Sequence, residues 1–90
     1  DKLMPGVSRD NDTSGGDLIP SQTSVKVDGE LVIVDGDGVA GHGLPPHIPQ
    51  TISADINSTV SIGGKNIVVA GDDADVCGEL ATGSSTVNIG

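Results

Sequence analysis

An internal repeat runs through this chain and limits the folds open to it. A shift of 35 residues places segment 24–37 over segment 59–72, and the chemistry matches along most of the block. A shift of 62 residues finds part of a third copy, with these matches: Asp10 on Asp72, Gly16 on Gly78, Asp17 on Glu79, Leu18 on Leu80 and Val25 on Val87. Units that cannot bury an apolar face alone bury it against each other. We therefore expect three pseudo-repeated hairpin units that form a small cone around a pseudo-threefold axis.

Strand signals dominate the repeated blocks, and no window has the periodicity of a helix. The expected strands, rich in β-branched residues, cover 24–28, 30–35, 59–63 and 66–70. Asp28-Gly29 and Gly63-Gly64 separate the paired strands, and such dipeptides supply the positive φ angles of two-residue hairpin turns. The sequence predicts an all-β fold.

The chain needs a stabilising element besides its core. Its 90 residues provide one domain at most, and Phe, Tyr and Trp are all absent. Cys77 is the only cysteine, so a disulfide within the chain is excluded and a metal or a partner is expected. We expect a single domain over residues 10–90, preceded by a loosely ordered segment or edge strand over residues 1–9.

The charge argues against a nucleic-acid ligand. Thirteen acidic and four basic side chains give a net charge of −9, which repels phosphate backbones. No apolar stretch is long enough for a membrane span, and we expect neither a transmembrane segment nor a signal peptide.

A metal site is predicted from the repeat. The shift of 35 residues places His42 on Cys77, and His47 lies in the proline-rich loop 41–50. Imidazole and thiolate suit zinc, and iron would accept the same ligands. A closed tetrahedral site needs a fourth ligand, for which we favour Glu79, two residues after Cys77, over Asp12 or Ser14.

Other interpretations of these residues remain open. Cys77 and the histidines could instead be a buried thiol and surface imidazoles. Cys77 beside a histidine could also act as a nucleophile, but no oxyanion-hole motif accompanies it, and we expect no enzymatic activity. The acidic segments 35–38 and 72–75 fit turns better than a calcium loop, because the required glutamate is missing.

The chain resembles the PAAR-repeat proteins over residues 10–90. The resemblance rests on Ser-x-Thr-Val-x-Ile-Gly-Gly-Lys at 58–65, Gly71-Asp72, Cys77-Gly78, the segment 82–90 and the His-Pro loop 42–50. The tetrapeptide that names the family is absent, since 66–69 reads Asn-Ile-Val-Val and 31–34 reads Leu-Val-Ile-Val. Family members typically bind zinc through three histidines and one cysteine, and here Ser14 or Glu79 stands where another histidine is expected.

The resemblance implies a non-enzymatic tip that caps and sharpens a trimeric β-helical spike in a type VI secretion system or a contractile phage tail. A pseudo-threefold cap would pair the strand edges that such a spike exposes at its end. The expected locations are the tip of a virion baseplate or the bacterial cytoplasm before injection, with transient contact to a target membrane. The alternative is a freestanding small metal-binding or Cys-His enzymatic domain.

Overall fold

The fold is built from short antiparallel strands. The computed structural model describes residues 5–89, and these residues contain no helix and hence none that could cross a membrane. The expectation of an all-β fold is confirmed. One sheet has the order β1-β2-β5-β6, with β1 at Thr13–Ser14, β2 at Gly16–Ile19, β5 at Gly38–Val39 and β6 at Gln50–Thr51. The two remaining pairs are β3 (Lys26–Val27) with β4 (Glu30–Leu31) and β7 (Ser61–Ile62) with β8 (Lys65–Asn66).

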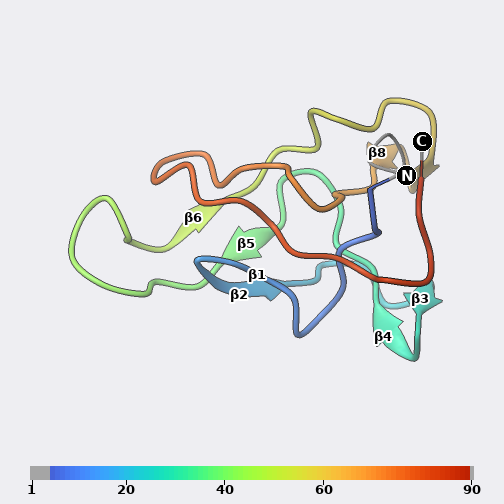
Figure 1. Cartoon of the computed structure of the whole chain (residues 1–90), viewed down its shortest axis with the longest axis horizontal. Helices are drawn as coiled ribbons and strands as arrows, with labels where there is room; N and C mark the ends of the chain where they lie inside the picture. The colour runs from blue at the N-terminus through green and yellow to red at the C-terminus, as the bar shows by residue number, and fades with distance from the viewer. Residues whose placement is uncertain (1–4, 90) are drawn as a thin grey trace.

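Both predicted hairpins are present, although their regular parts are only two residues long (Figure 1). The turn between β3 and β4 has φ angles of 56° at Asp28 and 83° at Gly29. The turn between β7 and β8 has φ angles of 59° at Gly63 and 84° at Gly64. Positive φ at both central residues is the requirement of a type I′ turn, whose twist matches that of the flanking strands.

Three buried segments are joined in a closed ring of backbone hydrogen bonds. The N–H of Ile33 donates to the carbonyl of Ser8 at 3.0 Å, and the N–H of Val68 donates to Ile33 at 2.9 Å. The N–H of Ser8 then donates to Val68 at 3.0 Å, which closes the ring. All three residues are fully buried. The ring relates the three segments cyclically, while a regular cone around a threefold axis remains a prediction.

The same turn follows each ring segment. Its aspartates, Asp12, Asp37 and Asp72, are buried, and each carboxylate accepts a hydrogen bond from the backbone N–H three residues earlier, at 2.8, 2.8 and 3.0 Å. The predicted match of Asp10 with Asp72 is therefore off by two residues. The shift of 62 residues does align Val25 with Val87, but the connection from Asp72 to Val87 is two residues longer than the connection from Asp12 to Val25.

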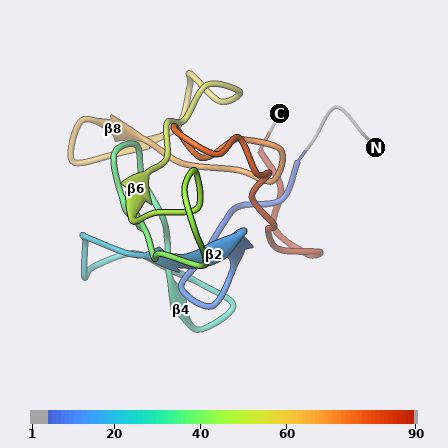
Figure 2. The ribbon, with the colours of Figure 1, turned by 90° about the vertical axis from the view of Figure 1, so that its left-hand side faces the viewer.

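The beginning and the end of the described chain form the third unit together. Val7 donates its N–H to Val87 at 2.9 Å, and Ile89 donates to Pro5 at 2.9 Å. Val7 is buried, so residues 5–9, which we set apart from the domain, contribute to its interior. The two hairpins and these paired segments point in different directions when the molecule is seen end-on (Figure 2). Residues 1–4 lie outside the described part.

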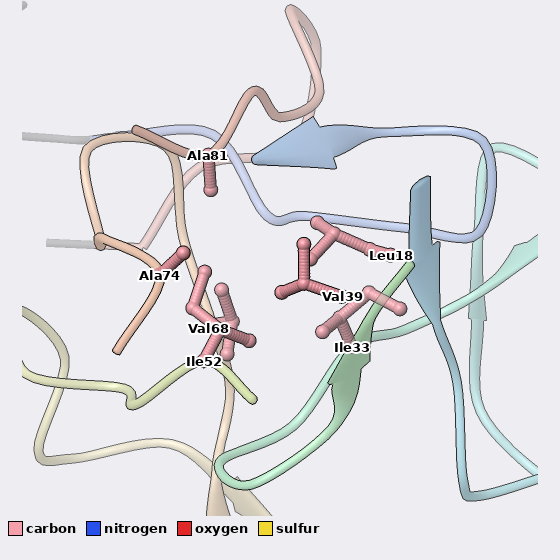
Figure 3. Close-up of a cluster of buried hydrophobic side chains, with 7 residues drawn as sticks. All are labelled: Leu18, Ile33, Val39, Ile52, Val68, Ala74 and Ala81. Carbon is pink, nitrogen blue, oxygen red and sulfur yellow. The ribbon is translucent and has the colours of Figure 1, made fainter. Parts of the chain in front are cut away.

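The core has two layers of small aliphatic side chains. The first layer contains Val7, Val32, Ile67 and Val69, with Val27, Ile62 and Ile89 packed against it. The second layer contains Leu18, Ile33, Val39, Ile52, Val68, Ala74 and Ala81 (Figure 3). Cys77 packs against the second layer, so the buried core reaches up to the site described next.

Candidate metal centre

The loop between β5 and β6 positions both histidines. It spans residues 40–49 and projects from the end of the molecule away from the two hairpins (Figure 1). The N–H of His42 donates to the carbonyl of His47 at 2.9 Å, and the N–H of His47 donates to Leu44 at 2.8 Å. These bonds close the loop on itself and bring the two imidazole rings to a centroid distance of 4.9 Å.

A tight turn presents the other two candidate ligands. The N–H of Ala74 donates to the carbonyl of Glu79 at 3.0 Å, and the N–H of Gly78 donates to Ala74 at 3.0 Å. Cys77 and Glu79 therefore lie in one compact turn, which adjoins the histidine loop at the same end of the molecule (Figure 1).

The structure brings all four predicted site residues together. One donor atom from each of His42, His47, Cys77 and Glu79 lies within 4.8 Å of every other. Glu79 Oε1 lies 2.5 Å from His42 Nε2 and 3.0 Å from His47 Nδ1, while the two nitrogens are 3.1 Å apart. Cys77 Sγ lies 3.5 Å from Glu79 Oε1 and 3.9 Å from His42 Nε2. These four side chains could hold a metal ion.

The surroundings of His42 orient its ring for this purpose. The carbonyl of Ala40 lies 2.9 Å from His42 Nδ1, and since a carbonyl can only accept, Nδ1 carries the proton. Nε2 therefore faces the cluster: it donates to the Glu79 carboxylate when the ring is protonated on both nitrogens, and it would offer a lone pair to a metal when the ring is neutral, an arrangement common among metal-bound histidines. The Ala40 carbonyl raises the pKa of His42 above its usual value, against the effect of desolvation, and the Glu79 carboxylate adds to the rise.

Glu79 responds in the opposite direction. The hydrogen bond with His42 lowers the pKa of Glu79 below its usual value, although desolvation opposes the change, and Cys77 and His47 reinforce it. Glu79 thus remains a carboxylate with a negative charge directed at two imidazole nitrogens. Such a convergence of lone pairs on one point suits a cation.

Gln50 joins the two halves of the site. Its side-chain oxygen accepts hydrogen bonds from the N–H groups of Val76 and Cys77, both at 2.8 Å. Its side-chain nitrogen donates to the carbonyls of Pro46 at 3.1 Å and Ile48 at 2.8 Å. One amide therefore fixes the histidine loop against the cysteine turn, a role that no motif in the sequence indicates.

Two glycines leave room for the cluster. A Cβ atom on Gly15 would lie 2.1 Å from Glu79 Oε1 and 2.6 Å from His42 Nε2. A Cβ atom on Gly16 would lie 2.6 Å from His42 Nδ1. The segment that holds Gly15 and Gly16 thus contributes a close backbone approach in place of a ligand. The only signal in the sequence is the Gly-Gly dipeptide itself.

The other residues considered for the site have different roles. Asp12 is bound by Arg9 and Thr82, away from the cluster. Ser14 is buried and donates its hydroxyl to the backbone carbonyl of Glu79. In the acidic segments 35–38 and 72–75, Asp37 and Asp72 accept backbone hydrogen bonds, as expected of turn residues. Comparison with models of protein families and with curated proteins finds no match to this chain.

Proposed function

We propose that this chain is a PAAR-type tip, a non-enzymatic cap that sharpens the end of a trimeric β-helical spike in a contractile injection machine. Three observations support the proposal. The ring of Ser8, Ile33 and Val68 ties three segments together, a cluster of metal-type ligands lies at one end, and a repeated apolar surface lies at the other. The repeated surface is the strongest support, because a surface that is repeated three times predicts a partner with threefold symmetry.

The repeated surface consists of Val25, Val60 and Val87, which we call the base valines. They are 39%, 40% and 39% exposed. Each base valine donates its backbone N–H to a side-chain oxygen three residues earlier, and these oxygens belong to Gln22, Asn57 and Ser84 at 2.8, 3.1 and 2.9 Å. One chain thus repeats the same turn, with a similarly exposed valine, three times.

A trimer is the natural partner for such a surface. Each subunit of a threefold partner can meet one base valine in an equivalent environment, which a single asymmetric patch could not provide. Val25 and Val60 directly precede the hairpins β3–β4 and β7–β8, which lie at the end of the molecule opposite the histidine loop (Figure 1). The base would sit on the spike while the metal centre forms the apex.

Zinc fits the donor set of two nitrogens, one sulfur and one oxygen. Zn–N bonds of about 2.0–2.1 Å and Zn–S bonds of about 2.3 Å give tetrahedral ligand separations of roughly 3.3–3.6 Å. The separations of 3.1, 3.5 and 3.9 Å come close to this range, and Glu79 Oε1 would move outward from its 2.5 Å contact with His42. Four protein ligands complete the coordination shell, as in structural sites, and iron is the runner-up.

The ion would stiffen an apex that has little core of its own. The histidine loop and the cysteine turn are joined by Gln50 and by contacts within the cluster. A bound ion would add three or four strong bonds across this junction, so its binding energy would contribute directly to the stability of the apex.

Elemental analysis tests the metal. We expect one zinc per chain in the purified protein, and its loss in His42→Ala, His47→Ala and Cys77→Ser variants. Asp73→Asn is the control, because Asp73 is exposed and lies outside the cluster. This substitution removes one negative charge without removing a candidate ligand. A folded protein that takes up no metal at micromolar zinc would contradict the proposal.

Complex formation tests the partner. A trimeric β-helical spike fragment, mixed with the chain and analysed by light scattering after gel filtration, should yield one chain per trimer. Replacing Val60 with Asp should abolish the complex, whereas Cys77→Ser should leave it intact. Absence of a complex with spikes from both secretion systems and phage tails would count against the tip function.

One contact favours a second candidate, a Cys-His enzyme. Cys77 Sγ lies 3.9 Å from His42 Nε2, within reach for formation of a thiolate. Hydrolytic activity that disappears in a folded Cys77→Ser variant, in protein stripped of metal, would support the enzyme over the tip.

A further inference from the structure

The four candidate ligands differ in how firmly the structure holds them. The side chain of His42 is only 16% exposed, and its Nδ1 is fixed by the carbonyl of Ala40 at 2.9 Å. The side chain of Cys77 packs against the second layer of the core, and its backbone N–H is held by Gln50 at 2.8 Å. These two ligands form an anchored inner side of the cluster.

Glu79 and His47 form the outer side of the cluster. Their side chains are 42% and 40% exposed. Within residues 5–89, the hydrogen bonds of the Glu79 carboxylate involve only His42, His47 and Cys77, which are candidate ligands themselves. The Glu79 carboxylate is therefore held by the cluster alone, at the end of a long and flexible side chain.

Of the two outer ligands, Glu79 is the more easily replaced. Imidazole nitrogen is a preferred donor for zinc and iron, whereas carboxylate oxygen suits harder cations such as magnesium and calcium. His47 is carried on a shorter side chain, and its ring lies against that of His42 at a centroid distance of 4.9 Å. An incoming nitrogen donor would therefore displace the carboxylate before the imidazole.

The surroundings of the cluster favour a neutral donor over an anionic one. Asp73 and Asp75 are exposed close to Cys77 in the sequence, and the chain carries a net charge of −9, so phosphates and free thiolates are repelled. An imidazole that binds a metal is neutral, and its second nitrogen carries an N–H group. The displaced carboxylate of Glu79 can accept this N–H. A histidine side chain is the donor that fits these conditions.

The donor has to come from another protein. The chain contains two histidines, and both lie in the cluster, so a second copy has no imidazole to spare. The approach to Glu79 is open: Leu80, the next residue, is 64% exposed, and a Cβ atom on Gly78 would meet nothing within 4 Å. A peptide can reach this side of the cluster without rearrangement of the backbone.

We propose that Glu79 is an exchangeable ligand, and that a histidine side chain of a second protein takes its place on the ion. In this exchange the bond between Glu79 and the metal breaks, and a bond from the incoming imidazole nitrogen forms. The freed carboxylate then accepts the N–H of that imidazole. The inference rests on the proposed function, since it needs a metal in the cluster, and it adds a class of partner for the apex.

Cobalt spectroscopy tests the exchange. The probe is the blocked peptide acetyl-Gly-His-Gly-amide, added to cobalt-loaded protein, and the same peptide with lysine in place of histidine is the control. We expect a saturable shift of the visible cobalt bands, while the charge-transfer band from the Cys77 thiolate persists. The lysine peptide should leave both features unchanged.

Variants of the two glutamates give the magnitude. Glu79→Ala should bind cobalt about 100-fold more weakly than the parent, the upper value for a disturbed metal site. The histidine peptide, at about ten times its dissociation constant, should restore about tenfold of that affinity by mass action. Glu30→Ala is the matched control, because Glu30 lies on β4, outside the cluster, and should change neither quantity.

Glu79→His separates exchange from simple addition. Its imidazole is tethered at the exchangeable position, so this variant should bind cobalt without responding to the peptide. An equal response of the parent and Glu79→His would mean that the peptide adds to the site without displacing Glu79, and would overturn the inference. A shift with free imidazole but none with the peptide would overturn the assignment to a second protein.

The outcomes distinguish this inference from the proposed function. Protein that binds cobalt or zinc and forms the spike complex, but does not respond to the histidine peptide, overturns the exchange and leaves the tip function standing. Protein that takes up neither metal and forms no spike complex overturns the tip function together with the exchange.

Discussion

Replacing Gly15 with Ala should weaken metal binding while leaving the fold intact. The new Cβ atom would lie 2.1 Å from Glu79 Oε1, well inside van der Waals contact, and 2.6 Å from His42 Nε2. Glu79 is the more mobile of the two, since its side chain is 42% exposed. We expect the carboxylate to swing out of the cluster and to leave the ion with three ligands.

The chain offers a control with the same backbone conformation. Gly15 has a φ angle of 82° and Gly29 has a φ angle of 83°, but a Cβ atom on Gly29 would meet nothing within 4 Å. Alanine at either position costs about 1–2 kcal/mol, because an L side chain is strained in the left-handed region. Gly29→Ala therefore carries the strain alone, and Gly15→Ala carries the strain together with the intrusion.

The magnitude follows from the lost ligand. Mutation of a residue that supports a metal ligand typically weakens binding 10- to 100-fold, and we take the upper value, about 100-fold, for displacement of the ligand itself. With zinc at about 1,000 times the parent dissociation constant, binding adds about 4.1 kcal/mol to the free energy of unfolding. A 100-fold weaker site adds only about 1.4 kcal/mol under the same conditions, so the variant loses about 2.7 kcal/mol beyond the strain.

Urea denaturation with and without zinc measures both parts. In chelator, Gly15→Ala should lose somewhat more stability than Gly29→Ala, because the intrusion also displaces Glu79 from its contact with His42. In excess zinc, the difference in unfolding free energy between the two variants should widen by about 2.7 kcal/mol, and a competing zinc dye should report the weaker affinity of Gly15→Ala directly. Equal losses for the two variants in zinc would show that Gly15 does not shape the site and would refute the reasoning.

Three further predictions follow from the hydrogen bonds. Asp72 accepts three backbone N–H bonds, so Asp72→Asn should lower the free energy of unfolding by about 1.5–3 kcal/mol, whereas the exposed neighbour Asp73→Asn should change it by less than about 0.5 kcal/mol in the same urea titration. Gln50→Leu should weaken zinc affinity about tenfold in dye competition without altering spike binding, because it releases the histidine loop from the cysteine turn. Burial acts to raise the pKa of Asp12, but the hydrogen bonds from Arg9 outweigh it and hold that pKa below its usual value. The contribution of Asp12 to the free energy of unfolding is therefore present above about pH 4, the pKa range of the unfolded carboxyl, and is lost as pH falls through the lower folded pKa. Arg9→Gln should flatten the acid side of a plot of unfolding free energy against pH.

The hairpins and the four site residues could be predicted because each depends on local chemistry. Asp28-Gly29 and Gly63-Gly64 demand one kind of turn wherever they occur, and the structure has that turn at both places. The match of His42 with Cys77 by a fixed shift indicated two ligands at equivalent positions, and Glu79 followed from its distance to Cys77. Gln50 and Gly15 could not be found in this way, since their roles depend on where the histidine loop folds back against other segments.

The third unit was predicted only in part, because it is not continuous in the sequence. Its inner strand is the segment around Val7 and its outer strand is the segment around Val87, joined by a hydrogen bond between the two ends of the chain. Contiguous segments compared at a single shift of 62 residues place Asp10, and not Asp12, on Asp72. The buried carboxylate of Asp12, which takes the same backbone bond as Asp37 and Asp72, reveals the register only in three dimensions.

In the proposed tip, the two ends of the molecule would obey different symmetry requirements. A surface that meets three equivalent subunits gains from three equivalent contacts, and the base valines are almost equally exposed. A tetrahedral ion needs four ligands, which three equal units cannot supply symmetrically. The cluster accordingly takes His42 and Cys77 from matched positions of two units and adds His47 and Glu79 from the adjoining loop and turn. The segment that holds Gly15 provides only space, so filling that space should weaken metal binding at the apex and leave the base unchanged.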